Sequence, residues 1–301
     1  MVEQLIAVFC EIDDFCKEYN SNFVRGKNQI TGEAPAISRT SMALSEIMTI
    51  TVMYHLSHYK EFKWYYIEKV RGDWKEYFPK LLSYNRFVEI MQIITVPMIL
   101  YTMKDSFGKC SGINFVDSTS LDVCDNHRIH SRKVFADFAR KGKSSTGWFF
   151  GFKLHLAIND RGEIIAFCLT PGNVDDRDWA VISKLTKEMF GKVFADRGYL
   201  SAALFEKLYS NGIQLVTKLK KNMKNKLMDM TEKILLRKRA IIECVNDFLK
   251  NICQIEHSRH RSVANFIVNI ISSLVAYSFL PKKPSLNIFH DCSDGNISLC
   301  A

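Results

Sequence analysis

The chain has 301 residues, of which 47% are hydrophobic and 24% charged, a composition that excludes a disordered protein and allows one large core or two modest ones. Its nine cysteines form no C-x-x-C pair, which argues against a disulfide framework or a zinc ribbon and favours a reducing cytoplasm. The formal net charge of +9 and the pI near 9.0 indicate a polyanionic partner.

The N-terminal segment lacks the features of a signal peptide. The stretch MVEQLIAVFCEIDDFCKEY has no basic leader and is interrupted by acids, so we expect an amphipathic helix. The apolar stretch FIVNIISSLVAYSFL, which begins at Phe266, is shorter than a bilayer span and contains Asn269. We therefore expect no membrane segment and a cytoplasmic location.

Residues 1–105 show helical spacing and little strand character. Apolar residues repeat at helical intervals from Leu44 and again from Tyr84, where Pro97 is expected to kink or end the helix. The segment between them, YKEFKWYYIEKVRGDWKEYF, is dense in aromatics. These rings either fill a small helical core, which their spacing favours, or stack on nucleic-acid bases.

From Gly112 the pattern becomes β-rich. The stretches GINFVDSTSLDV and WFFGFKLHLAIND are predicted strands, and IIAFCLT follows a turn at residues 161–162. After Gly172 the predicted order is helix, strand, helix, strand and helix, the last being MTEKILLRKRAIIECVNDFLKNI. Antiparallel strands followed by alternating strands and helices are the order of an RNase H-like α/β domain. We expect this mixed sheet flanked by helices to follow an α-helical N-terminal region.

Two acids occupy corresponding places in two of these predicted strands. Asp117 ends the apolar run INFVD, and Asp196 ends KVFAD. If the strands are parallel neighbours, both carboxylates lie side by side, which is costly unless a cation lies between them. Oxygen ligands alone favour Mg²⁺ or Mn²⁺ over zinc. Each acid taken singly could instead be an ordinary turn residue.

A third carboxylate could come from a helix packed against the same edge of the sheet. Glu243 lies in RAIIECVNDFLK, beside an apolar stripe that includes Ile242 and Val245. Taken alone it could be an ordinary surface glutamate, because Glu is rarely buried unpaired. The expected convergence with the two strand-end acids favours the metal-ligand role.

Six segments, in this order, resemble a bacterial insertion-sequence DDE transposase: VDSTSLDV, GWFFGFKLHLAIN, TPGNVDDRD, ADRGYLS, RKRAIIECVNDFLK and IEHSRHRS. The most similar group is that of the insertion sequences numbered nine hundred and eighty-two. The resemblance runs from about Gly112 to the segment that begins at Pro281. It implies a helical DNA-binding region at 1–105, an RNase H-like DDE catalytic domain at 106–284 and a tail, 285–301, that we expect to be disordered.

The resemblance also implies the catalytic residues. Asp117, Asp196 and Glu243 would be the DDE triad, binding two Mg²⁺ ions for which Mn²⁺ can substitute. Related enzymes carry the pattern Tyr-x₂-Arg-x₃-Glu-x₆-Lys. Arg239 matches its arginine, whereas Leu236 stands at its tyrosine position.

Lys250 completes this pattern, and the resemblance implies that Arg239 and Lys250 hold the phosphates of transposon ends. Both lie close to whole helical turns from Glu243, so an unbroken helix would place all three side chains on one face. The alternative is a surface ion pair with an acid of the same helix, such as Asp247.

A second basic segment, EHSRHRS, follows this helix. His257 and His260 could form part of a zinc site, but no cysteine or further histidine pair accompanies them. Phosphate contacts by Arg259 and Arg261, with the histidines as additional donors, are favoured over zinc and over a solvated loop.

Other polar segments have simpler interpretations. Asp175 and Asp176 are expected to cap the next helix, in preference to a metal role. Residues 128–145 are expected to form a basic loop on the DNA-facing side.

The resemblance thus implies a cytoplasmic DNA transposase that cuts the terminal inverted repeats of its own element and joins the 3′ ends to target DNA by two-metal-ion phosphoryl transfer. A homodimer is expected because two ends must be brought together. Two alternatives stay open: a metal-dependent nuclease of the same fold without strand transfer, and a transposase-derived DNA-binding protein without catalysis.

Overall fold

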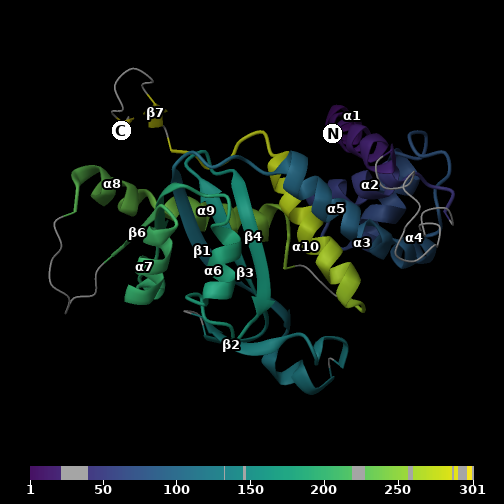
Figure 1. Cartoon of the computed structure of the whole chain (residues 1–301). Helices are drawn as coiled ribbons and strands as arrows, with labels where there is room; N and C mark the ends of the chain where they lie inside the picture. Colours follow the sequence, from purple (N-terminus) through teal and green to yellow (C-terminus); the bar gives the residue numbers. More distant parts are fainter. Residues whose placement is uncertain are drawn as a thin grey trace. The chain divides into compact units, whose positions relative to one another are not determined.

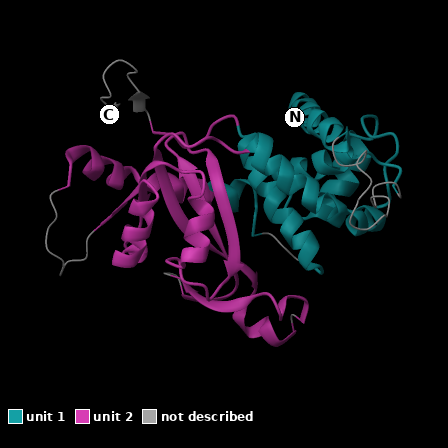
Figure 2. Cartoon of the chain, viewed as in Figure 1, with its two compact units in different colours: residues 1–106, 248–280 teal, residues 107–247, 281–301 magenta. Residues whose placement is uncertain are grey.

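The computed structural model describes residues 1–21, 40–131, 133–144, 147–218, 228–256 and 260–286, and the backbone of 288–290 and 297–299. The chain forms two compact units (Figure 2). The helical unit comprises Met1–Ser106 and Phe248–Leu280, and the sheet unit comprises Phe107–Asp247 and Pro281–Ala301. Residues 248–280, which fall in the predicted catalytic domain, therefore pack with the N-terminal helices.

The helical unit is built around two almost wholly buried helices, α2 and α10, which pack against each other. The buried polar residues of α10, among them Asn269 and Ser273, therefore lie in a protein core. The helical segments are α1 (Val2–Tyr19), α2 (Leu44–Leu56), α3 (Phe62–Trp64), η3 (Tyr65–Asp73), α4 (Tyr84–Ile90), η4 (Met91–Ile94), α5 (Thr95–Tyr101), η5 (Thr102–Ser106), η9 (Phe248–Ile252) and α10 (Val263–Ser278).

The helical run Tyr84–Ser106 is the one described helix that is long and apolar enough to cross a membrane, with a mean hydropathy of 1.3. Of its most apolar window, 44% is buried inside the protein. Pro97 does not end this helix, so of the two predicted outcomes, a kink or an end, the second is wrong. It lies in the first turn of α5, after a 3₁₀ turn, where a missing N–H is tolerated.

The aromatic residues of the helical unit mostly fill its core, as the spacing indicates. Tyr65, Tyr66 and Trp74 are buried, and the Tyr66 ring lies 4.8 Å from that of Phe87. Trp64 and Tyr77 are exceptions, because their side chains are exposed.

The main sheet of the sheet unit has six described strands in the order β2-β3-β1-β5-β6, with β4 also paired to β3. Figure 1 shows β1, β3 and β4 side by side, and these strands pair antiparallel, whereas β1–β5 and β5–β6 pair parallel. The predicted mixed α/β fold is confirmed. The strands are β1 (Ile113–Cys124), β2 (Arg140–Ser144), β3 (Gly147–Asn159), β4 (Ile164–Pro171), β5 (Gly191–Ala195) and β6 (Ile213–Thr217).

Strand β2 corrects the prediction of a basic loop at residues 128–145. Residues Arg140 to Ser144 pair antiparallel with β3, from Gly151 to Gly147. An exposed strand of charged residues at a sheet edge shows no hydrophobic alternation, so its sequence resembles that of a loop.

The helices of the sheet unit follow the predicted order with local differences. They are α6 (Trp179–Leu185), α7 (Ala202–Ser210), α8 (Met230–Lys238) and α9 (Ala240–Asp247), with short 3₁₀ segments η6 (Asn126–Ser131), η7 (Lys133–Phe135) and η8 (Arg197–Tyr199). Ser201 caps α7 by accepting a hydrogen bond from the Leu204 backbone, and Gly212, with φ +75°, follows its end. The single long helix predicted for residues 230–252 is interrupted at Arg239.

The expected disorder of the tail, 285–301, stays a prediction. Its described backbone forms a short antiparallel pair, β7 (Ile288–His290) with β8 (Ile297–Leu299).

Candidate active site

The parallel pairing of β1 and β5 places Asp117 and Asp196 at equivalent positions. The pairs run in constant register to Phe115 and Phe194, and each acid lies two residues beyond its member of that pair. Neighbouring strands lie about 4.8 Å apart, so the two carboxylates begin from adjacent backbone positions. The sheet thus brings together the two acids that the sequence singled out.

The two acids differ in their place along the strands. Asp196 directly follows β5 and is exposed, as predicted for a strand end. Asp117 is not at a strand end, contrary to the prediction, because β1 continues to Cys124 through its pairing with the long strand β3. Only the parallel part of the β1 pairing ends near Asp117.

Helix α9 contacts β1 and brings further polar groups to Asp117. The Arg239 guanidinium lies between two carboxylates, with Nη1 3.9 Å from Asp117 Oδ2 and Nη2 2.5 Å from Glu243 Oε1. Asn246 Nδ2 donates to Asp117 Oδ2 at 3.5 Å. The Glu243 side chain is 58% exposed, whereas those of Arg239 and Asp117 are only 16% and 21% exposed.

The two other acids act electrostatically on Asp117. The pKa of Asp117 is raised to about 6, mainly by burial and also by the charges of Glu243 and Asp196, while Arg239 and the Ser118 backbone N–H oppose the rise. The carboxylates are therefore close enough to repel each other. Arg239 offsets that repulsion in the present arrangement.

The carboxylate oxygens of these residues suit a divalent cation, but they are not arranged to bind one ion together. Among the residues that the structure describes, no group of three or more His, Cys, Asp or Glu side chains lies close enough to hold a metal ion. Arg239 Nη1 and Asn246 Oδ1 are buried without a hydrogen-bond partner, which suits a site that receives a charged ligand. Asp117 and Asp196 fit a hard cation, and Glu243 could join them after leaving Arg239.

The remaining predicted site residues lie in the helical unit. Lys250 pairs with Glu256 at 2.6 Å, and it belongs to the π-helix η9, so the predicted spacing from Glu243 in an unbroken α-helix is not realised. Arg261 is exposed. His260 packs on the Phe266 ring, and burial lowers its pKa to about 4, so it is uncharged near neutral pH.

Two further predicted residues, His257 and Arg259, lie outside the described residues. Their predicted phosphate contacts therefore stay a prediction.

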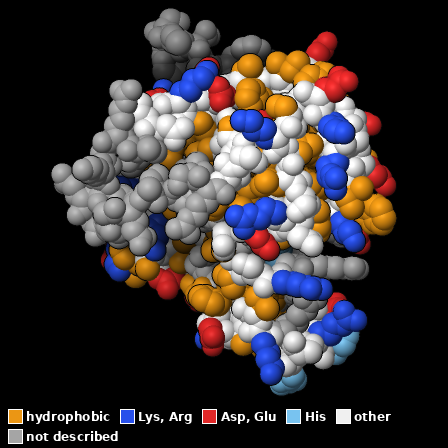
Figure 3. Space-filling model, turned by 90° about the vertical axis from the view of Figure 1, so that its right-hand side faces the viewer, with side chains coloured by type: hydrophobic (Ala, Val, Ile, Leu, Met, Phe, Trp, Pro, Cys, Tyr) orange, Lys and Arg blue, Asp and Glu red, His pale blue; other side chains and the backbone are white. Residues whose placement is uncertain are grey.

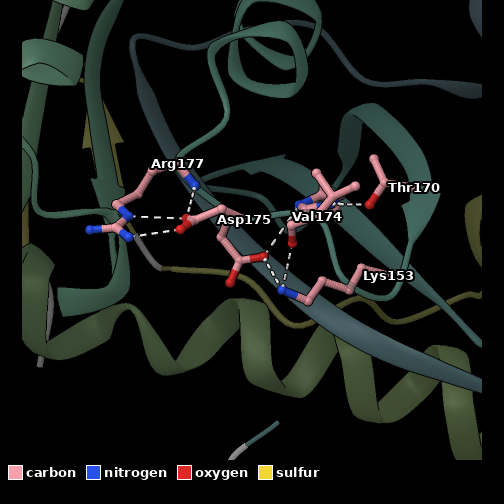
Figure 4. A network of polar contacts seen from close by, with 7 residues as sticks. Lys153, Thr170, Val174, Asp175 and Arg177 are labelled. Carbon is pink, nitrogen blue, oxygen red and sulfur yellow. Dashed lines mark hydrogen bonds and ion pairs between the residues drawn. The ribbon is translucent and has the colours of Figure 1, made fainter. Parts of the chain in front are cut away.

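A polar network beside the site was not predicted from the sequence. Lys153 of β3 donates to the carbonyl of Val174 at 2.9 Å (Figure 4), and it also donates to Asp176 at 3.1 Å. Buried His155 contacts Thr170 Oγ1 through Nε2 at 2.9 Å. The alternation of WFFGFKLHLAIND places Lys153 and His155 on one face of β3, the signal that could have revealed this network.

The acids of the DDRD segment do not cap α6 as expected. Asp178 caps that helix by accepting from the Ala180 backbone N–H at 2.8 Å. Asp175 is bound by both the backbone and the guanidinium of Arg177, which lowers the Asp175 pKa to about 2 (Figure 4). These contacts hold the turn before α6.

Residues 125–148, here called the basic arm, combine exposed cations with an exposed aromatic ring. Trp148 is 63% exposed, and Lys143 Nζ lies 5.8 Å from its ring centroid. Lys, Arg and His side chains gather at the lower end of Figure 3, where Figure 1 places β2. The exposed cations of the arm are Arg128, Lys133, Arg140, Lys141 and Lys143.

A mixed sheet with acids on adjacent parallel strands, and a glutamate on a helix that contacts the first strand, is the arrangement of an RNase H-like phosphoryl-transfer domain. Residues 107–263, just over half of the chain, match the family described as Transposase DDE domain. The chain belongs to this transposase family, whose members act on DNA and generally depend on a divalent metal. No curated protein sequence matches the chain.

Proposed function

We propose that this protein cleaves the ends of its own insertion sequence and joins the 3′ ends to target DNA. The observation that carries the proposal is the equivalent placement of Asp117 and Asp196 on adjacent parallel strands. Glu243 supports it because its charge acts on Asp117 from the helix that contacts β1. All three acids lie within the matched transposase domain.

In the proposed mechanism, Asp117 and Asp196 hold the cations and Glu243 completes the site. Bound Mg²⁺ would supply Lewis-acid activation of the attacking oxygen and neutralise charge on the leaving 3′-oxygen, with two ions per site. Arg239 keeps Asp117 paired before DNA binds. If Glu243 helped to hold a cation, the Arg239 guanidinium would be available to a neighbouring phosphate.

The same carboxylates can serve cleavage and joining, because only the attacking oxygen differs between the two reactions. A water oxygen attacks in the first, and the freed 3′-hydroxyl attacks in the second. Neither step requires a covalent protein–DNA intermediate.

The proposed DNA contacts extend beyond these acids. The basic arm, Lys250 and Arg261 would contact phosphates, and we propose the same role for His257, Arg259 and His260. The N-terminal helices would recognise the terminal repeats. We also propose a homodimer, because two element ends must be held together. The proposed location is the cytoplasm.

One observation favours a second candidate, a transposase-derived DNA-binding protein without catalysis. The Arg239–Glu243 ion pair keeps the third carboxylate occupied. If this ion pair persists when DNA is bound, only Asp117 and Asp196 would remain to bind cations.

Purified protein incubated with DNA that carries its own element ends, together with a target plasmid, tests the proposal. We expect nicks at the ends and joined products in Mg²⁺ or Mn²⁺, and neither in EDTA or Ca²⁺. Cleavage without joining would indicate a nuclease, and binding without cleavage would indicate the DNA-binding protein. Undiminished cleavage in EDTA would contradict the metal mechanism.

A further inference from the structure

The basic arm, residues 125–148, packs closely against the rest of the sheet unit. A Cβ added at Gly142 of β2 would overlap the Gly172 carbonyl oxygen, so only glycine allows β2 to approach the segment that follows β4. Phe135 of the arm is buried, and its ring packs edge-on against that of Phe152 in β3. The arm is therefore a folded element whose outer side chains are carried on an ordered base.

Two lysines and a tryptophan share one face of the β2–β3 pair. Lys143 lies directly opposite Trp148 in the register, and Lys141 lies opposite Phe150. Residues that are directly opposite, or two apart on one strand, point to the same face of a sheet. Phe150 is buried, whereas Lys141, Lys143 and Trp148 are exposed. The outer part of this face therefore presents an indole ring together with two cations.

The charge of the arm indicates the class of partner that this face fits. The sequence of the arm contains six Lys or Arg residues against two Asp. An excess of this size favours a polyanion. The ammonium group of Lys143 lies 5.8 Å from the centroid of the Trp148 ring, so positive charge is held where a ligand that covers the ring would bring a phosphate.

The exposed ring narrows the partner further. Phosphates account for the cations but not for an indole ring that is 63% exposed. Exposed aromatic rings beside cations are the combination with which proteins bind single-stranded nucleic acid, because every base has a flat face and every nucleotide a phosphate. In a continuous duplex the neighbouring base pairs cover both faces of each base. The ring therefore fits a base that is unpaired or unstacked.

The ring lies within reach of a strand held at the acids. Leu156 pairs with Asp117, and Trp148 precedes Leu156 by eight residues on the same strand. At about 3.3 Å per residue, the two positions lie about 26 Å apart along β3. Roughly eight nucleotides, spaced at about 3.4 Å as in a duplex, span the same length. A short single strand is therefore sufficient to connect the acids with the ring.

We propose that Trp148 stacks on an unpaired base of a DNA strand, and that Lys141 and Lys143 bind the phosphates next to that base. Stacking of this kind accepts any of the four bases, because it uses only their flat faces. The arm thus holds single-stranded DNA near the acids, whereas its contacts with a duplex use the cations alone. The choice of DNA, among polyanions that carry flat rings, rests on the proposed function.

The test measures, by fluorescence anisotropy in EDTA, how the full-length protein binds a labelled oligothymidylate of about 16 nucleotides and a duplex of the same length. Trp148→Leu keeps an apolar side chain but removes the flat ring, and Trp148→Phe keeps a smaller ring. We expect Trp148→Leu to weaken binding of the single strand by about tenfold, the loss of one stacked base, and to leave duplex binding within about twofold. Trp148→Phe should retain most of the single-strand affinity.

The matched control is Tyr209→Leu, which removes an exposed aromatic ring on α7 of the same unit. It should bind both DNAs like the wild type. Stacking on a base also quenches tryptophan emission, so saturating oligothymidylate should quench the wild type more than Trp148→Phe. Circular dichroism spectra verify that each variant folds.

Three outcomes would overturn the proposal. Unchanged single-strand binding by folded Trp148→Leu would show that the ring does not stack on a base. An equal loss for the single strand and the duplex would show that the ring does not select unpaired bases. Reduced self-association of Trp148→Leu in sedimentation, with DNA binding unchanged, would indicate an interface between two copies of the chain. Binding is measured without a divalent metal and without element ends, so it can succeed where the end-cleavage assay fails, and the two proposals fail separately.

Discussion

Each unit of this chain holds a buried neutral histidine, His155 in the sheet unit and His55 in the helical unit, but the two units differ in the charges beside them. In the sheet unit, partly buried charges are matched by opposite charges, as in the pairs of Asp117 with Arg239 and of Asp176 with Lys153. In the helical unit, buried His55 stays neutral and keeps a free acceptor. A metal ion or a phosphate can replace one partner of such an ion pair, because it carries the same sign of charge. A neutral acceptor binds instead to a group that donates a hydrogen bond. The partly buried ion pairs beside Asp117 therefore give the sheet unit groups that a charged ligand can displace.

The largest expected effect comes from removing charge at the sheet unit's acids. Asp117→Asn, Asp196→Asn or Glu243→Gln should reduce end cleavage by at least about 10³-fold, because each removes a ligand whose cation supplies several kcal/mol of transition-state stabilisation. DNA affinity should stay close to that of the wild type. Cleavage and binding assays on the same element-end duplex measure both quantities.

The matched control is Glu206→Gln, which changes an exposed glutamate on α7 of the same unit. It should cleave at the wild-type rate. Folded Asp117→Asn and Asp196→Asn proteins that also cleave normally would show that the assigned acids are wrong.

A smaller effect should follow from the neutral histidines. Burial is the main cause that lowers the pKa of His55, His155 and His260 to about 4, against an ordinary value of 6.5. His55 faces the Cys253 carbonyl and His260. His155 faces Asp176 and Asp178, which raise its pKa, and Lys153, which lowers it.

Between about pH 6.5 and pH 4 the unfolded chain binds protons that the folded chain does not. The free energy of unfolding should therefore fall as pH is lowered through this window, by up to about 1.4 kcal/mol per pH unit for each histidine. Denaturant titrations at several pH values measure the slope. His55→Gln should reduce it, whereas His130→Gln, at an exposed position of the basic arm, should not. Equal slopes in the wild type and His55→Gln would show that His55 does not contribute to the pH dependence of the free energy of unfolding.

Local sequence patterns predicted much of the sheet unit. Apolar runs located β1 and β5, and the position of each acid within its run was sufficient to align Asp117 with Asp196. Ser201 and Gly212 identified the ends of α7, because capping chemistry is local. These features depend on a few neighbouring residues, so they can be predicted from a single sequence.

Other features depend on contacts between distant segments and were not predictable. The side chain that pairs with Glu243 is decided by rotamers and by the turn at Arg239, which helical periodicity does not encode. The helical unit contains a cavity that arises because α10, after the sheet, packs against α2, before it. The sequence placed His55 on an apolar helical face. Its contact with the distant Cys253 carbonyl, which requires the proton on Nδ1, could not be predicted from that pattern.

The smallest expected effect concerns the basic arm of the sheet unit. If Lys141 and Lys143 contact DNA phosphates, replacing either with Ala should lower the slope of log affinity against log salt by roughly one unit, because each contact releases about one counterion. Lys187→Ala, at an exposed position outside the arm, should leave the slope unchanged. Lys143 has an alternative role, since its ammonium group lies over the Trp148 ring. In that case Lys143→Ala would change Trp148 fluorescence while the salt slope stays at the wild-type value. Salt titrations of duplex binding, with fluorescence recorded on the free proteins, separate a phosphate contact from a lysine that only covers the ring.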